Sequence, residues 1–420
     1  MAKNPDEQQG RSLTEPFANN LPARHRTARL WQLAFLASTI VGIVILTALL
    51  FNIVNSAFGL AAVQVKVDPA TLAMDGVPIE KQTKVQLVQI LEGSLKPAVY
   101  KRLETEKPFV GRSRNEAYDL VVERVVEPKV EQTWPLFDSL LHRQEVLAEM
   151  AQEYPDAKAK FLSWIDAKFL VTPQSSQAER AGVRTAILGS LWTIAITILV
   201  AFPVGVCAAI YLEEYARDNW INRLIRTNIN NLAGVPSIIY GMLGLAIFVR
   251  ALERLTSGTA FGFADPTTAN GRTILSAGLT LALLILPVII INGQEAIRTV
   301  PTSLREASFG LGATKWQTVW AHVLPSALPG ILTGTILAMS RAIGETAPLV
   351  VVGASTFINK DPGGPFSKFT TLPIQIYQWT SRPQAEFRNI AAAAIMVLLV
   401  LLLALNATAI MLRNRSSRRL

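Results

Sequence analysis

The chain has 420 residues, of which 50% are hydrophobic and 17% are charged, and its mean hydropathy is +0.32. This composition is too apolar for an ordinary water-soluble protein of this length and favours a membrane protein. The one cysteine, Cys207, excludes an intramolecular disulfide and a cysteine metal cluster. The three histidines are scattered without metal-ligand spacing, so we expect no metal site.

Six apolar windows approach the roughly 20 residues that a helix needs to cross the hydrocarbon core. We therefore predict an all-α membrane protein with six transmembrane helices. The expected spans are 31–54, 186–212, 229–249, 274–291, 328–355 and 390–412. The first window exceeds the hydrophobic core of a signal peptide, which is about 7 to 15 residues long, so we expect a retained anchor.

Charge predicts the topology. Arginines and lysines precede the first span, in the tail 1–30, and follow the last, in the basic tail 413–420, so both termini should be cytoplasmic. Segment 55–180 differs in charge from the basic remainder of the chain, because it has 16 basic and 18 acidic residues and a net charge of −2. We expect it to be a periplasmic insert domain between the first two spans, followed by a membrane domain, 181–412, with a cytoplasmic loop at 295–327.

The insert shows local patterns of both strand and helix. Residues 63–69 alternate apolar and polar side chains as a strand does, while the segment from Val85 and the segment 136–150 are amphipathic with helical spacing. We therefore predict a small α+β module. It contains no catalytic triad, metal set or phosphate loop, so its sequence does not indicate a role.

Two charges interrupt the window 328–355. Arg341 and Glu345 are four residues apart, which places them on one face of a helix. Because a charge at mid-bilayer costs about 2.5 to 3.5 kcal/mol on insertion scales, we expect the pair to face protein or water and to line a substrate pathway. A guanidinium fork suits an oxyanion. The alternative is a structural pair that joins helices. Gly330 and Gly334 form a GxxxG pattern that allows close helix contact.

The motif GVPSIIYG predicts a second pathway element, in the third window. Pro236 removes an amide and Gly234 and Gly241 permit bending, while Ser237 and Tyr240 supply hydroxyls. Kinked backbone at membrane depth is tolerated where it faces protein or water, so we expect this segment to line or gate a pathway. A kink that serves packing alone is the alternative.

The loop 295–327 carries a spaced motif with a glycine that permits a turn between two short helices. The motif residues are Glu306, Ala307, Ser308, Gly312, Leu324 and Pro325. They resemble the cytoplasmic loop of permease subunits of ABC importers, with Ser308 and His322 as departures. The resemblance implies that this loop docks on a separate ATPase. A surface helix-turn-helix is the alternative. The chain has no GxxxxGK[ST] phosphate loop to bind ATP itself.

Two further stretches, 340–355 and 231–248, resemble the PstA family of permeases of bacterial phosphate importers, over about 184–412. The resemblance implies a non-enzymatic inner-membrane subunit without a cofactor of its own. It also implies a PstC-like sister permease, a PstB-like ATPase dimer that binds ATP and Mg, and a PstS-like periplasmic phosphate-binding protein. The membrane lipid and phosphate are expected partners, and nucleic acid is not. The insert departs from the compact form of the family.

Two other classes of function remain open. In an ion-coupled secondary transporter, Arg341 and Glu345 would relay protons and no ATPase would be needed. In a membrane receptor or scaffold, the insert would be the sensor and the spans would only anchor it. Neutralising Arg341 would then leave uptake intact. Physical chemistry alone also leaves phosphate, sulfate and molybdate open, because one guanidinium can bind all three.

Overall fold

The computed structural model describes residues 21–74, 76–263, 270–354, 357–358 and 360–417, and it is mostly helical, as predicted. The chain divides into two compact units, Met1–Asn52 and Ile53–Leu420. The described part of the first unit belongs to helix α1 (Leu21–Ala57). The apolar side chains of α1 are exposed all round from Leu21 to Phe51. A helix with this pattern is typical of a membrane span.

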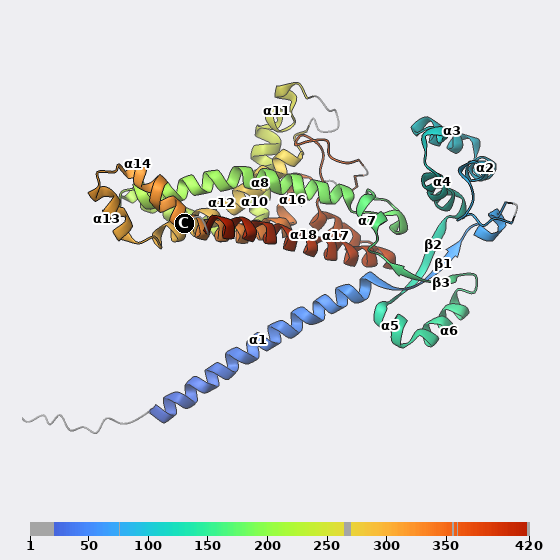
Figure 1. Ribbon diagram of the computed structural model, residues 1–420, viewed down its shortest axis with the longest axis horizontal. Coiled ribbons are helices and arrows are strands. Elements are labelled where there is room, and N and C mark those ends of the chain that lie inside the picture. Colours follow the sequence, from blue (N-terminus) through green and yellow to red (C-terminus); the bar gives the residue numbers. More distant parts are fainter. Residues whose placement is uncertain (1–20, 75, 264–269, 355–356, 359, 418–420) are drawn as a thin grey trace, which may run out of the picture. The chain divides into compact units, whose positions relative to one another are not determined.

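The second unit contains four more long apolar helices, so the described residues include five that could cross a membrane. The four are α8 (Arg184–Ile210), which continues into the π-helix η6 (Tyr211–Tyr215), α12 (Ile274–Arg298), α15 (Leu324–Gly344) and α18 (Ala385–Ser417). Helix α12 packs against α8 (Figure 1). It also packs against α15, and α15 packs against α18. Leu281, Ile285 and Ile289 of α12 are fully buried, which makes α12 the central helix of this bundle.

The third predicted window is a bent pair of helices. Helix α9 (Trp220–Ala233) and the segment formed by α10 (Ser237–Gly244) and the π-helix η7 (Leu245–Ala251) meet at 106°. Among the described residues, six helical spans are reached only if this pair counts as one. The break falls where Pro236 cannot donate a backbone hydrogen bond, so the kink expected there is a complete interruption of the helix.

The fifth predicted window, 328–355, is wrong as a continuous helix. Helix α15 ends at Gly344, and a short helix α16 (Ala347–Val352) follows it. Pro348 explains the end, because its ring would clash with the carbonyl of Gly344 in a continuing helix and it has no N–H to donate. The expected last residue of this span, Ser355, lies outside the described residues.

The segment between α1 and α8 contains a three-stranded antiparallel sheet in the order β2-β1-β3. The strands are β1 (Phe58–Val65), β2 (Pro128–Pro135) and β3 (Lys158–Ser163). The helices are α2 (Lys84–Ser94), α3 (Pro97–Glu106), α4 (Arg114–Val121), α5 (Leu136–Leu141), α6 (Arg143–Glu153) and α7 (Ala167–Val171). Val130 of β2 shares a core cluster with Phe387 and Ile390 of α18.

Two local predictions in this segment need correction. The strand expected at 63–69 begins earlier and ends at Val65, because Pro69 opens a short 3₁₀ turn, Pro69–Leu72. The single helix expected over 136–150 is two helices that meet at His142, and Leu140 and Leu141 lie exposed outside the core.

The predicted loop 295–327 is a helical hairpin. It contains the end of α12, then α13 (Thr302–Gly310), α14 (Lys315–Thr318), the π-helix η9 (Val319–Val323) and the start of α15. Two further α-helices of the second unit are α11 (Glu253–Thr256) and α17 (Leu372–Thr380), and α17 packs against α18.

Candidate functional site

Arg341 and Glu345 form an ion pair at the end of α15. The guanidinium Nε lies 3.3 Å from Glu345 Oε1, and the two side chains are 43% and 18% exposed. Arg341 is in the last helical turn, where a cation is favoured by the partial negative charge of the free carbonyl groups. Glu345 follows the helix with extended backbone. In the isolated chain, the Arg341 guanidinium is therefore accessible to solvent and has one carboxylate beside it.

Tyr240 bridges the break between α9 and α10. Its side chain is buried, and its hydroxyl donates a hydrogen bond of 2.8 Å to the carbonyl of Leu232 in the last turn of α9. It belongs to the same core cluster as Ala338 and Ala342 of α15, and α10 packs against α12 and against α16, the short helix that follows the Arg341 pair. Ser237 is half-buried at the start of α10. The Tyr240 hydroxyl already has a partner in this conformation.

Three of the predicted glycines stand where helices touch. A Cβ on Gly241 would lie 2.7 Å from the Cα of Pro348, and one on Gly330 would lie 2.8 Å from the Cβ of Ala296. A Cβ on Gly334 would overlap Asn292. Gly330 and Gly334 therefore face α12 of the same chain. The remaining glycine, Gly234, ends α9 and has no such close neighbour.

Gly312 forms the turn between α13 and α14. Its φ is +83°, which L side chains rarely adopt, and the amides of Gly312 and Ala313 donate to the carbonyls of Phe309 and Ser308. This is the Schellman arrangement that ends a helix at a left-handed residue. The Ser308 hydroxyl, a departure from the motif, lies 2.9 Å from that of Thr318 on α14. The turn and this buried contact fix the angle of the hairpin.

The hairpin presents an apolar surface, which we call the hairpin face. It consists of Phe309, Leu311, Trp316 and Trp320, with Leu311 91% exposed and the two indoles stacked at 5.6 Å. Glu306 and Ala307 are exposed beside it, and His322 is exposed on η9. Leu324 and Pro325 are half-buried at the start of α15. Several large exposed apolar side chains on one hairpin are typical of a protein contact site.

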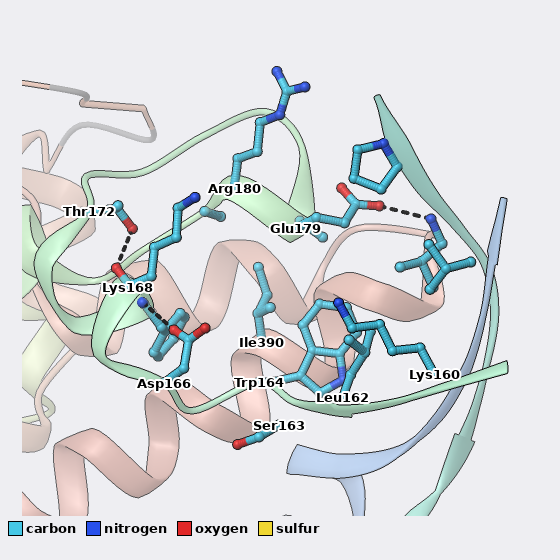
Figure 2. Close-up of a pocket in the computed structure, with 16 residues that line it drawn as sticks. Lys160, Leu162, Ser163, Trp164, Asp166, Lys168, Thr172, Glu179, Arg180 and Ile390 are labelled. Atoms are coloured by element: carbon cyan, nitrogen blue, oxygen red, sulfur yellow. Dashed lines mark hydrogen bonds between the residues drawn. The ribbon is translucent and has the colours of Figure 1, made fainter. Parts of the chain in front are cut away.

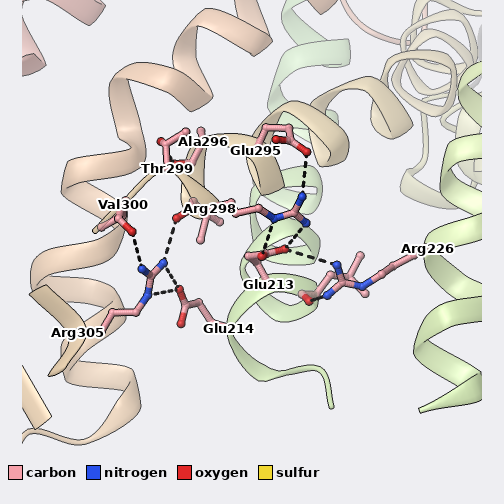
Figure 3. A network of polar contacts seen from close by, with 11 residues as sticks. Glu213, Glu214, Arg226, Glu295, Ala296, Arg298, Thr299, Val300 and Arg305 are labelled. Atoms are coloured by element: carbon pink, nitrogen blue, oxygen red, sulfur yellow. Dashed lines mark hydrogen bonds and ion pairs between the residues drawn. The ribbon is translucent and has the colours of Figure 1, made fainter. Parts of the chain in front are cut away.

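An ion-pair network next to the hairpin was missed by the sequence analysis. Glu213 and Glu214, at the end of η6, contact arginines from three other elements (Figure 3). The arginines are Arg226 of α9, Arg298 of α12 and Arg305 of α13. Two adjacent carboxylates directly after an apolar span were the available signal, but their partners lie up to 91 residues away.

The structure also has a cavity of about 210 Å³ in the insert, away from Arg341 (Figure 2). It is lined by Leu162, Trp164 and Ile390 together with the cations Lys160, Lys168 and Arg180. Arg180 pairs with Glu123 at 3.1 Å and Lys168 with Asp119 at 3.3 Å. In the part of the chain that the structure describes, no three His, Cys, Asp or Glu side chains gather as a metal site would require.

Among the known proteins similar to this chain, three examples each match more than half of it. The probable ABC transporter permease protein YqgI of Bacillus subtilis is 36% identical over 219 residues, which is 52% of this chain and 68% of that protein. The phosphate transport system permease protein PstA 1 of Mycobacterium tuberculosis is 35% identical over 57% of this chain and 72% of its own. PstA of Yersinia pestis is 33% identical over 56% and 73%.

The family match covers the part of the chain that holds the hairpin and the Arg341 pair. The model of the binding-protein-dependent transport system inner membrane component matches residues 201–418, whereas the insert lies before this range. This chain therefore belongs to the family of binding-protein-dependent transport system inner membrane components, the permease subunits of ABC importers.

Proposed function

We propose that this chain is the PstA-like permease subunit of an ATP-driven importer of inorganic phosphate and forms half of its translocation pathway. The observation that carries the substrate assignment is the similarity, over 240 residues, to a permease named for phosphate transport. The chain is an inner-membrane component by family. It would work with a PstC-like sister permease, a PstB-like ATPase dimer that binds ATP and Mg, and a PstS-like phosphate-binding protein.

The substrate pathway in this proposal passes Arg341. Its exposed guanidinium offers a planar fork to a phosphate oxyanion, and Glu345 at 3.3 Å partly neutralises it, so that the anion is attracted and then released. The broken span at Gly234 and Pro236 supports this assignment, since interrupted helices at membrane depth occur where they face protein or water. Ser237 and Tyr240, at the start of α10, are the hydroxyls we assign to the pathway.

The ATPase would transmit its movement to this chain at the hairpin face. We assign the ATPase contact to Glu306, Ala307 and Gly312 with the exposed apolar side chains beside them, because this surface is open and apolar in a family that needs other subunits. Leu324 and Pro325 would connect the contact to α15. Closure of the ATPase subunits would then move the hairpin, and the pathway would open alternately to the two sides of the membrane.

The topology in this proposal follows the positive-inside bias. Both termini and the hairpin face the cytoplasm, and the insert faces the periplasm. We assign to the insert a contact with the phosphate-binding protein or the sister permease, because it lies outside the part of the chain that the family model matches. A chain without the insert should therefore assemble or transport poorly. Normal assembly and uptake after deletion would contradict this assignment.

The test is ATP-dependent phosphate uptake by the reconstituted complex with substitutions at the pathway and the hairpin. Arg341→Gln should abolish uptake while leaving assembly intact, since it removes the oxyanion fork and keeps the size of the side chain similar. Glu345→Gln should retain uptake with altered affinity. Glu306→Ala should loosen ATPase binding instead. Full uptake by Arg341→Gln would refute the pathway.

A further inference from the structure

Three consecutive residues at the end of η6, Glu213, Glu214 and Tyr215, each contact a different part of the molecule. We call these three residues the η6 junction. Glu213 accepts two hydrogen bonds of 3.1 Å from the guanidinium of Arg298, at the end of α12, and lies 3.5 Å from Arg226 of α9. Arg226 also donates to the carbonyl of Leu212. The junction therefore joins the end of α8, which η6 continues, to the middle of α9 and to the end of α12.

Glu214 extends the same junction to the hairpin. Arg305 of α13 donates to Glu214 Oε1 from two nitrogen atoms, at 2.8 and 3.0 Å. It also donates to the carbonyls of Val300 and Ile297, at 2.7 and 3.0 Å. Ile297 is in the last turn of α12 and Val300 follows its end, where carbonyls lack the amide partner that a continuing helix would supply. One guanidinium thus connects three elements at once (Figure 3).

Tyr215 provides a further contact with the hairpin. Lys315 of α14 places its ammonium group 5.2 Å from the centre of the Tyr215 ring, within the range of a cation–π interaction. Both helices of the hairpin are therefore attached to η6, one through Glu214 and the other through Tyr215. The π-helix allows this, because its wider turn directs successive side chains differently from an α-helix, and such turns occur often at functional sites.

Burial separates these contacts from ordinary surface pairs. Glu214 and Arg305 are 9% and 17% exposed, and Glu213 is 17% exposed. The nearby pair of Arg223 and Asp218 is 73% and 86% exposed. Exposed pairs contribute little to stability, whereas removing one partner of a desolvated pair leaves the other charge unpaired. The Glu214–Arg305 pair therefore constrains the hairpin and the Arg223–Asp218 pair does not.

We propose that the η6 junction makes the hairpin, the middle of α9 and the ends of α8 and α12 move as one body. On the proposed function, on which this inference rests, Glu214 and Arg305 are positioning residues. Arg305 directly precedes Glu306, so the contact assigned to the ATPase and the attachment to the membrane helices are one residue apart. A hairpin released from the junction would still bind the ATPase, but it would no longer move the pathway.

The first test measures phosphate transported per ATP hydrolysed by the reconstituted complex. Glu214→Gln and Arg305→Gln should each lower this ratio about tenfold, equivalent to about 1.4 kcal/mol, while ATP hydrolysis and co-purification with the ATPase persist. The double variant should be no worse than either single one, because the two residues act as a unit. Asp218→Asn, the matched surface control, should equal wild type. An unchanged ratio in Glu214→Gln, or losses that multiply in the double variant, would overturn the proposal.

The second test does not depend on phosphate. In a Cys207→Ala chain with Arg217→Cys and Ser303→Cys, spin labels report the distance between the end of η6 and α13. In the complex with wild-type Glu214, this distance should differ by less than about 2 Å between nucleotide-free and ATP-trapped states, a common size for helix shifts. Glu214→Gln should make it differ by more.

A larger distance change with wild-type Glu214 would refute the one-body movement, even if Glu214→Gln failed to assemble. Absence of phosphate uptake by the wild-type complex would instead refute the proposed function. The two failures are therefore distinguishable.

Discussion

Gly312 shows at the residue scale how one backbone angle sets the shape of the hairpin. Its φ of +83° lies in the left-handed region, whereas Gly310 ends α13 in ordinary helical conformation. A Cβ on either glycine would meet no neighbour within 4 Å. The two positions therefore differ in backbone conformation and not in available space.

This difference gives a matched pair of substitutions. Gly312→Ala should destabilise the turn by about 1 to 2 kcal/mol, the cost of a left-handed L-residue. Gly310→Ala should leave stability unchanged or raise it, because alanine favours helix. Hydrogen exchange of the α13 amides in the full chain would measure both. Equal protection in the two variants would show that the left-handed turn does not constrain the hairpin.

Gly334 gives a second prediction at this scale. A Cβ there would overlap Asn292 of α12, whereas one on Gly344, at the end of the same helix, would meet nothing within 4 Å. Gly334→Ala should therefore destabilise the bundle by about 1 to 3 kcal/mol, as overpacked cores do. Thermal unfolding of the purified chain in detergent would show a lower Tm for Gly334→Ala than for Gly344→Ala. The reverse order would contradict close packing of α15 on α12.

Some of the charged contacts could be predicted from the sequence. Arg341 and Glu345 stood out because charges are rare in apolar windows, and they do form an ion pair. The contacts of Glu213 and Glu214 could not be predicted, since their partners Arg298 and Arg305 are 85 and 91 residues away in the chain. Pairing over such separations depends on how α8, α12 and α13 pack, and one sequence does not contain that information directly.

At the scale of elements, hydropathy located the long helices better than their ends. The window 274–291 was predicted correctly as a span, but α12 continues to Arg298 because polar residues can extend a helix beyond the apolar core. The third and fifth windows failed as continuous helices at Pro236 and Pro348 respectively. A hydropathy window averages over a break, so it cannot measure the 106° bend between α9 and α10.

Helix α4 of the insert supplies a pH prediction. The Lys107 hydrogen bond and then the Ser113 backbone amide hold the pKa of the Glu116 carboxyl below its ordinary value of 4.5. A depressed pKa means that this carboxylate stabilises the folded state above pH 4.5, and that the stabilisation is lost as the pH falls through the lower folded pKa. Hydrogen exchange of α4, corrected for intrinsic rates, should therefore show protection that declines below pH 4.5.

The control for this prediction is Glu116→Gln, which can keep the capping contact with Ser113 but does not titrate in this range. Its α4 should lose much of the pH dependence while the other helices of the insert behave as in wild type. The same decline in both proteins would mean that a different group controls the acid response of α4.

At the scale of the whole molecule, the family was readable from the hairpin motif and the stretches around Pro236 and Arg341. All three lie within the matched range 201–418. The motif was informative because its spacing reflects a helix, a left-handed turn and a second helix, as the structure shows at Gly312. The role of the insert was not readable, because the helices, sheet and cavity that the structure describes there show no combination of side chains that specifies a reaction or a ligand.

On the proposed function, phosphate crosses this subunit only when a partner ATPase supplies the energy. The most direct measurement is phosphate uptake into proteoliposomes that contain the complete complex, with the binding protein outside. We predict uptake with ATP and Mg at the ATPase side, and none with an imposed proton or sodium gradient in the absence of ATP. Uptake driven by a gradient through this chain without the ATPase would contradict the account.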